Sequence, residues 1–173
     1  MEENKTVRKS AVKTKTVEDI KPSDRVSLDN LCDWDLNFTS LESSRDIVIP
    51  AGVKNYKNLT VVEIDSQVKT GNALFVGTDG MGGHAPVKIN DPLIREYVFG
   101  EQVEPTQLTE DAVRNLLKIQ TKQKFYEALN NLVVTKAEKR MIFLLAEKVG
   151  VDDVPSYQLA AIEKISGIEF TLN

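Results

Sequence analysis

The chain has 173 residues, of which 41% are hydrophobic and 28% are charged, a balance that suits a globular protein and argues against wholesale disorder. Its net charge of −4 gives no global attraction to nucleic acid, and its single cysteine, Cys32, excludes an internal disulfide and a multi-cysteine zinc site. No apolar run approaches the ~18 residues of a membrane span, and no apolar stretch follows the basic N-terminus as in a secretory signal. These totals predict a protein made in a reducing cytoplasm, with no membrane partner.

Residues 1–24 form a polar arm that is rich in Lys, Thr, Ser and Glu and has no aromatic residue. Residues 1–16 carry five basic side chains against two acidic ones, whereas residues 17–36 carry six acidic side chains against two basic ones. No helical or strand period is present, so the arm cannot bury itself. It is either a disordered tail or a segment that becomes ordered on a partner. The basic residues expected to contact that partner are Arg8, Lys9, Lys13 and Lys15.

Residues 25–100 are predicted to form a small antiparallel β domain, either a sandwich or a barrel. Polar and apolar residues alternate over residues 33–38, which is typical of a half-buried strand. Short runs rich in β-branched residues indicate further strands, and Pro50 with Gly52 ends one of them. The expected strands are 33–38, 46–49, 59–64, 73–76, 86–90 and 94–99, with a short helix as the alternative for the last.

Residues 101–107 form a polar linker containing Pro105, which predicts a hinge, and residues 108–173 are predicted to form a small helical bundle. Apolar residues there recur at spacings of three and four, as on one face of a helix. The chain as a whole is therefore predicted to be α+β, with the β domain first and three or four short helices after it. The expected helix starts are at Thr109, at Thr135 with Glu138 as a capping box, and near Ser156; the expected ends are near Gly150 and Gly167.

Residues 77–84 are the most unusual stretch, because four of the nine glycines lie within seven residues. The stretch lacks the Lys-Ser/Thr pair that reaches phosphate and metal in a phosphate-binding loop, and a strand is expected to follow it instead of a helix. It is predicted to be a loop between two strands, either mobile or tightly folded, with an exposed recognition loop as the alternative. The loop residues expected to contact a partner are Gly77, Asp79, Gly80, Gly82, Gly83 and His84.

Groups able to carry chemistry are few. His84 is the only histidine; Asp79 lies five residues before it and Asp91 seven residues after it. A histidine with carboxylates could bind a metal or act as a base, but no nucleophile or second histidine accompanies it. Glu63 and Asp65 lie two residues apart on a predicted strand and would face the same side. They are either paired carboxylates able to do acid–base chemistry or bind a metal, or part of the polar outer face of the sheet. The acidic neighbour of Cys32 is expected to raise its pKa. We therefore assign no catalytic residue, no cofactor and no metal from the sequence.

Several basic residues of the helical region give it one possible basic face, although acidic residues are interspersed. The connection at residues 150–156 is long for a helix-turn-helix motif, and the last helix carries a single lysine, Lys164. A solvated mixed surface is therefore the default interpretation. The basic residues concerned are Lys118, Lys122, Lys124, Lys136, Lys139, Arg140 and Lys148.

The Lys5–Lys15 arm, the strand set from Asp46 to Asn90 with its glycine loop, and the helices between Thr109 and Gly167 together resemble accessory virion proteins of tailed phages, such as capsid-decorating or head-associated proteins. The resemblance lies in architecture, without a diagnostic motif. It implies a non-catalytic protein of the virion that binds neighbouring subunits of a larger assembly. Those subunits could include further copies of this chain.

Two other hypotheses remain open at this point. One is a regulatory binding module that uses the helical region and the arm, with nucleic acid as a less favoured partner. The other is a small metal- or nucleotide-dependent enzyme centred on Glu63, Asp79 and His84.

Overall fold

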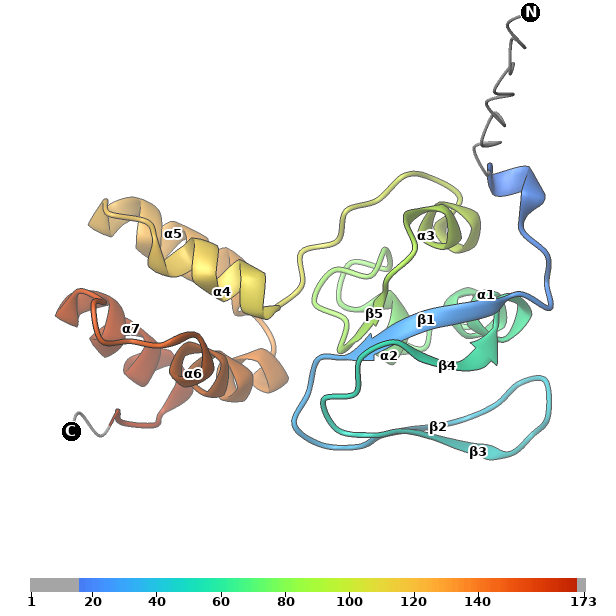
Figure 1. Cartoon of the computed structure of the whole chain (residues 1–173), viewed down its shortest axis with the longest axis horizontal. Coiled ribbons are helices and arrows are strands. Elements are labelled where there is room, and N and C mark those ends of the chain that lie inside the picture. Colours follow the sequence, from blue (N-terminus) through green and yellow to red (C-terminus); the bar gives the residue numbers. More distant parts are fainter. Residues whose placement is uncertain (1–15, 171–173) are drawn as a thin grey trace, which may run out of the picture.

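The computed structural model describes residues 16–170, and residues Arg8, Lys9, Lys13 and Lys15 of the predicted arm contact lie outside them. The described chain has a mixed α+β architecture in which the strands come first and helices follow (Figure 1). The strands are β1 (Arg25–Asn30), β2 (Leu36–Thr39), β3 (Asp46–Ile49), β4 (Tyr56–Thr60) and β5 (Val87–Ile89). The helices are η1 (Val17–Asp19), α1 (Val61–Lys69), α2 (Ala73–Val76), α3 (Pro92–Phe99), α4 (Glu110–Leu117), α5 (Lys122–Leu132), α6 (Lys136–Val149) and α7 (Ser156–Ser166).

Strand β1 is the centre of a three-stranded antiparallel sheet with the order β4-β1-β5. Val26 pairs with Leu59 of β4, Leu28 pairs with Ile89 of β5, and the pairing with β4 shifts register between Val26 and Leu28. Val26 and Leu28 are fully buried, so the middle strand supplies the base of the first hydrophobic core. The predicted antiparallel sheet is confirmed in this form, whereas a sandwich or barrel is not.

Strands β2 and β3 form a separate antiparallel hairpin that covers the same core. Leu36 and Phe38 are buried while Asn37 and Thr39 are exposed, so the predicted alternation is confirmed, with the strand starting at Leu36. Phe38 meets Phe75 of α2 edge to face, with ring centroids 5.3 Å apart. The predicted strands at residues 46–49 and 86–90 are also confirmed, as β3 and β5.

The strands predicted at 73–76 and, beyond Thr60, at 59–64 are wrong, because residues 73–76 and 61–69 are helices. At residues 94–99 the alternative of a short helix is confirmed, as part of α3. Each of these three helices begins at a polar side chain that accepts a hydrogen bond from a free backbone N–H of the first turn: Thr60 from Glu63, Asn72 from Leu74, and Asp91 from Leu93. Pro92 also favours a helix start at its position. These local caps outweigh the β-branched character that suggested strands.

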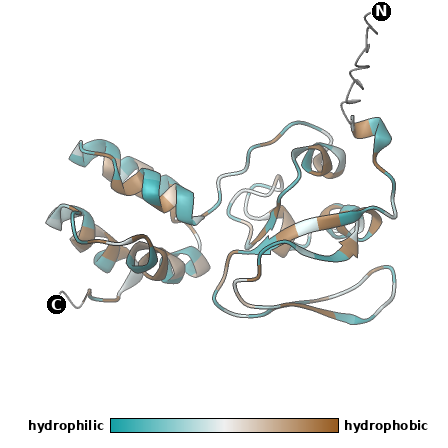
Figure 2. Cartoon of the chain, viewed as in Figure 1, coloured by the Kyte–Doolittle hydropathy of each residue, from teal (hydrophilic) through white to brown (hydrophobic). Residues whose placement is uncertain are grey.

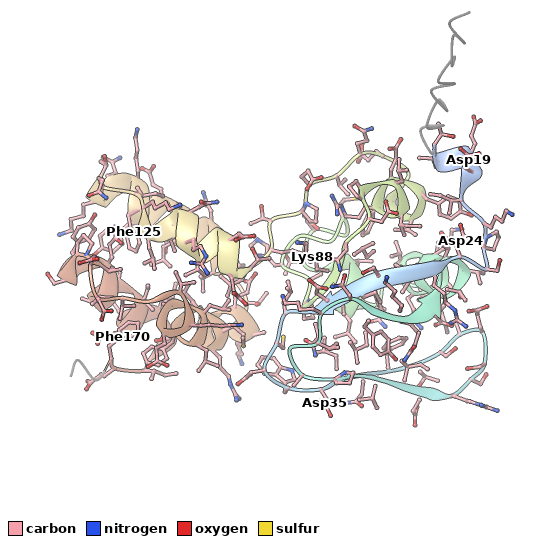
Figure 3. All side chains as sticks on the ribbon, in the orientation of Figure 1. Asp19, Asp24, Asp35, Lys88, Phe125 and Phe170 are labelled. Atoms are coloured by element: carbon pink, nitrogen blue, oxygen red, sulfur yellow. The ribbon has the colours of Figure 1, made fainter. Side chains whose placement is uncertain are left out.

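Helices α4 to α7 form a second part with a hydrophobic core of its own. Phe125 and Ile162 are fully buried there, and Phe170 stacks on Phe143 with ring centroids 4.4 Å apart (Figure 3). Figure 2 shows hydrophobic residues along β1 and along these helices. The predicted starts at Thr109, Thr135 and Ser156 and the ends at Gly150 and Gly167 are confirmed.

The connector at residues 100–107 joins the N-terminal part to the helices and is attached along its length. Arg95 of α3 donates from Nε to the Val103 carbonyl at 3.2 Å and forms an ion pair with Glu104. Buried Gln107 donates from Nε2 to the carbonyls of Ala85 and Val87, both at 3.1 Å. The predicted linker is therefore fixed to the edge of the sheet at β5.

Candidate functional site

The glycine-rich loop between α2 and β5 is tightly folded. The Thr78 N–H donates to the Gly83 carbonyl and the Gly82 N–H donates to the Val76 carbonyl, both at 2.9 Å. The Asp79 carboxylate accepts from the N–H groups of Met81 at 2.8 Å and Gly83 at 2.9 Å. These bonds close the loop on itself, so the role of the Asp79 carboxylate is structural.

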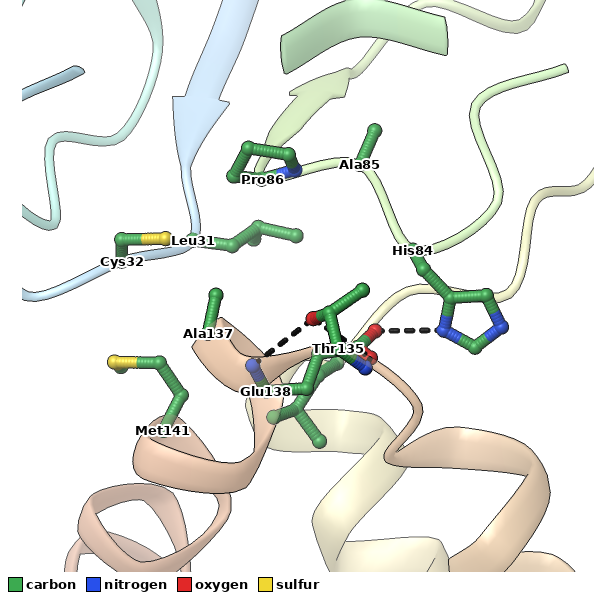
Figure 4. A pocket seen from close by; sticks show the side chains of 10 residues that line it. Leu31, Cys32, His84, Ala85, Pro86, Thr135, Ala137, Glu138 and Met141 are labelled. Atoms are coloured by element: carbon green, nitrogen blue, oxygen red, sulfur yellow. Dashed lines mark hydrogen bonds and ion pairs between the residues drawn. The ribbon is translucent and has the colours of Figure 1, made fainter. Parts of the chain in front are cut away.

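The loop divides the predicted contact residues into inner and outer ones. Gly82 and Gly83 are buried and Gly77 is half-buried, whereas Asp79 and Gly80 are exposed at the tip. Of the loop residues expected to meet a partner, Asp79 and Gly80 are therefore presented to solvent. His84, the last of them, is half-buried and points toward the helical part (Figure 4).

His84 joins the two parts of the structure. Its backbone N–H donates to the Thr106 carbonyl at 2.7 Å, and its Nδ1 lies 2.7 Å from Oε1 of Glu138 on α6 (Figure 4). Its φ of +59° belongs to the left-handed region, which non-glycine residues seldom adopt. The loop therefore holds His84 in an uncommon backbone conformation and against a carboxylate 54 residues away.

Glu138 uses its two carboxylate oxygens for two different tasks. Oε2 accepts from the N–H groups of Val134 at 2.9 Å and Thr135 at 2.8 Å, which completes the predicted capping box of α6. Oε1 faces His84. The carboxylate is largely buried, at 8% side-chain exposure, so its hydrogen bonds are protected from competing water.

A second contact crosses the junction at the loop between β1 and β2. Arg140 of α6 forms an ion pair with Asp33 at 3.1 Å and lies over the Trp34 ring, 5.2 Å from its centroid. Trp34 in turn packs against both hydrophobic cores. Between the two contacts remains a cavity of about 20 Å³ beside Cys32 and Met141, which has room for about one water molecule. A second cavity of about 230 Å³ lies at the same junction, and residues of both parts, among them Lys54 and Leu144, line it.

Cys32 borders this cavity and is 3% exposed. Burial, with the negative charge of Asp33 as a second cause, raises the pKa of its thiol to about 11. The expected direction of the shift is confirmed, and the thiol stays protonated and unreactive at neutral pH.

Glu63 and Asp65 do not form the pair that the sequence suggested. They lie on helix α1, where residues two apart point to nearly opposite faces. The buried Glu63 carboxylate accepts from the N–H groups of Leu41 at 3.0 Å and Glu42 at 3.1 Å, whereas Asp65 forms a salt bridge with Lys69. Ser40 Oγ and Gln67 Nε2 also donate to Glu63, each at 2.7 Å. The hydrogen bonds outweigh the opposing effect of burial and hold the pKa of Glu63 below its ordinary value.

His84→Ala is expected to lower the free energy of unfolding by about 1–2 kcal/mol, because the Glu138 carboxylate loses a buried hydrogen-bond partner. Glu138→Ala is expected to cost more, because it also removes the cap of α6. Urea denaturation measures both, with the exposed Glu147→Ala on the same helix as the control. Equal stability of His84→Ala and this control would show that the contact does not hold the two parts together.

Across residues 16–170 there is no group of three or more His, Cys, Asp and Glu side chains placed to hold a metal ion. Nor does that stretch contain a helix of the length and apolar character needed to cross a membrane. No protein-family model, curated protein or solved structure gives a significant match to the chain.

Proposed function

We propose that this chain is a non-catalytic structural protein of a larger assembly. Stated most concretely, it is a capsid- or head-associated component of a phage virion. Its N-terminal arm and the tip of its glycine loop would bind neighbouring protein subunits. The observation that carries the proposal is the use of the Glu63, Asp79 and His84 side chains, which hold segments of the fold to one another.

Each of these three groups was a candidate for chemistry, and each has structural partners instead. Glu63 binds the turn between β2 and β3, Asp79 closes its own loop, and His84 meets the cap of α6. A general base or metal ligand needs lone pairs directed at a substrate or an ion. Here the lone pairs of Glu63 are directed at four donors within the protein. This arrangement favours an architectural role over an enzymatic one.

Residues 16–24, the described end of the predicted arm, are firmly attached, so the expectation that the arm cannot bury itself is wrong for these residues. Val17 of η1 packs against the first hydrophobic core, and η1 contacts α3. Ile20 is buried in the same core, at 7% exposure. A segment whose base is fixed and whose own sequence is basic can reach a neighbouring subunit without loosening the fold. The exposed loop tip at Asp79 and Gly80 offers a second, rigid contact.

Deleting residues 1–15 is expected to leave a folded protein that no longer enters its assembly. Every residue of the two described cores lies after this segment, so the free energy of unfolding should change by less than about 0.5 kcal/mol. A longer deletion that removed Ile20 would damage the first core and confuse the two effects. Tagged full-length and truncated chains are expressed in the native host, and their enrichment in sedimenting particles is compared.

The contribution of charge is separated with a third chain, in which Arg8, Lys9, Lys13 and Lys15 are changed to glutamine. This variant keeps the length of the arm and should also fail to enter the particles. Normal incorporation of the truncated chain would contradict the proposal. Normal incorporation of the glutamine variant alone would show that arm length matters and its charge does not.

A further inference from the structure

We propose that the groove between α5, α6 and α7 binds an acidic amphipathic helix of a partner protein. The groove has a volume of about 370 Å³. Its apolar lining comes from Leu129, Ala161 and Ile165, and the remaining lining residues are Tyr126, Asn130, Lys139 and Lys164. This surface belongs to the helical part and is separate from the arm and the glycine loop, so the inference goes beyond the proposed function.

The floor of the groove is apolar and well supported. Leu129 and Ala161 are 2% and 6% exposed and belong to the second core, so the open apolar surface of the groove comes mainly from Tyr126 and Ile165. Tyr126 is 36% exposed, one of the few large hydrophobic side chains of the described chain left open to solvent. An apolar floor between packed helices is the usual receptor for the apolar stripe of another helix.

The charge of the groove has one sign. Lys139 comes from α6 and Lys164 from α7, and neither forms an ion pair with any residue between 16 and 170. No carboxylate lines the groove, and the nearby Glu163 accepts a hydrogen bond from the Phe170 N–H at 2.8 Å.

Two other basic residues of the same region have acidic partners: Lys148 binds Glu110 at 2.6 Å, and Arg140 binds Asp33 at 3.1 Å. Lys118, Lys124 and Lys136, which lie outside the groove, also form no ion pair within residues 16–170. The two groove lysines are therefore available to a negatively charged partner. Their positions on two different helices suit carboxylates on either flank of a bound helix.

The lining favours a protein segment over nucleic acid. Single-stranded nucleic acid is bound by several aromatic platforms together with a basic track for its phosphates. This groove has a single aromatic residue, Tyr126, and two lysines, which is too few for a row of stacked bases with a basic track beside it. An amphipathic helix with leucines on one face and glutamates beside them matches both the floor and the two lysines.

The probe is a fluorescein-labelled peptide of roughly four helical turns, with leucines at i, i+3, i+4 and i+7 and glutamates elsewhere. Fluorescence anisotropy with the full chain is expected to show saturable binding. Lys139→Glu with Lys164→Glu should weaken binding at least about tenfold. Lys118→Glu with Lys124→Glu changes the net charge equally outside the groove and should alter binding less than about twofold. Circular dichroism melts confirm that both variants are folded.

Two further probes separate the alternatives. The same peptide with glutamine in place of glutamate should bind at least about tenfold more weakly, because the lysines then lack partners. Labelled oligothymidine should show no binding that depends on Lys139 and Lys164. Absence of peptide binding, equal weakening by the two double variants, or oligothymidine binding that the groove variant abolishes would each overturn the proposal.

Discussion

Replacing Glu63 with glutamine is expected to lower the free energy of unfolding by about 3 kcal/mol. The carboxylate is 2% exposed and accepts hydrogen bonds from two backbone N–H groups in the turn between β2 and β3. An amide has one acceptor oxygen and a donor group in place of the second one, so at least one buried donor would lose its partner. Thermal and urea denaturation measure the change, with Asp65→Asn on the same helix as the control, which loses one salt bridge to the exposed Lys69 and should cost about 1 kcal/mol or less.

The loss should depend on pH in a defined direction. The pKa of Glu63 is lower in the folded protein than its ordinary value of 4.5. A carboxylate with a lowered folded pKa stabilises the fold above its unfolded pKa, and this stabilisation disappears as the pH falls through the folded pKa. The difference in stability between the wild type and Glu63→Gln is therefore expected to be full at neutral pH and to shrink below pH 4.5. A difference that stays constant down to pH 3 would contradict this account of the carboxylate.

Gly77→Ala is expected to destabilise the protein by more than about 3 kcal/mol and to open the glycine loop. Gly77 has φ +64° and ψ −144°, a region that is essentially restricted to glycine. A Cβ there would overlap with the carbonyl oxygen of Gly83, which is backbone that cannot turn aside. Because this carbonyl accepts the hydrogen bond of Thr78, the overlap would break the contact that closes the loop.

Gly80→Ala in the same loop is the matched control. Gly80 also has a positive φ, +81°, but a Cβ there would meet no atom within 4 Å. Its cost should be about 1 kcal/mol, from the backbone conformation alone. Limited proteolysis reports whether the loop opens. If the two substitutions destabilise the protein equally, the close approach of Gly77 to Gly83 is not what holds the loop closed.

The fold was predictable where a sequence pattern depended on neighbouring residues alone and fitted one type of secondary structure. The capping box at Thr135 and Glu138, the glycine ends at Gly150 and Gly167, and the alternation around Phe38 all describe short-range geometry, and all are confirmed. The strand predicted at residues 59–64 failed because β-branched residues suit a first helical turn as well once Thr60 caps it. The Thr60–Glu63 spacing was visible in the sequence and would have indicated the helix.

The junction was harder to predict, because its contacts are long-range. Glu138 was identified as a helix cap, but its second oxygen meets His84 across 54 residues of sequence. The periodicity of apolar residues carries no information about such a pair. In a single sequence, a histidine that bridges the sheet-containing part and the helical part looks the same as one exposed to solvent. The pairing of His84 with Glu138 depends on how α6 packs against the glycine loop.

The attached connector gives the molecule a second route for mechanical load, beside the backbone that leads from η1 into β1. Helix η1 contacts α3, and Arg95 of α3 holds the connector at Val103. Gln107 then fastens the connector to β5 just before the first helix of the bundle. A pull on the arm by a neighbouring subunit would therefore reach the helices through a chain of side-chain contacts at the edge of the fold. Tension would be shared between these hydrogen bonds and β1, which follows η1 directly in the chain.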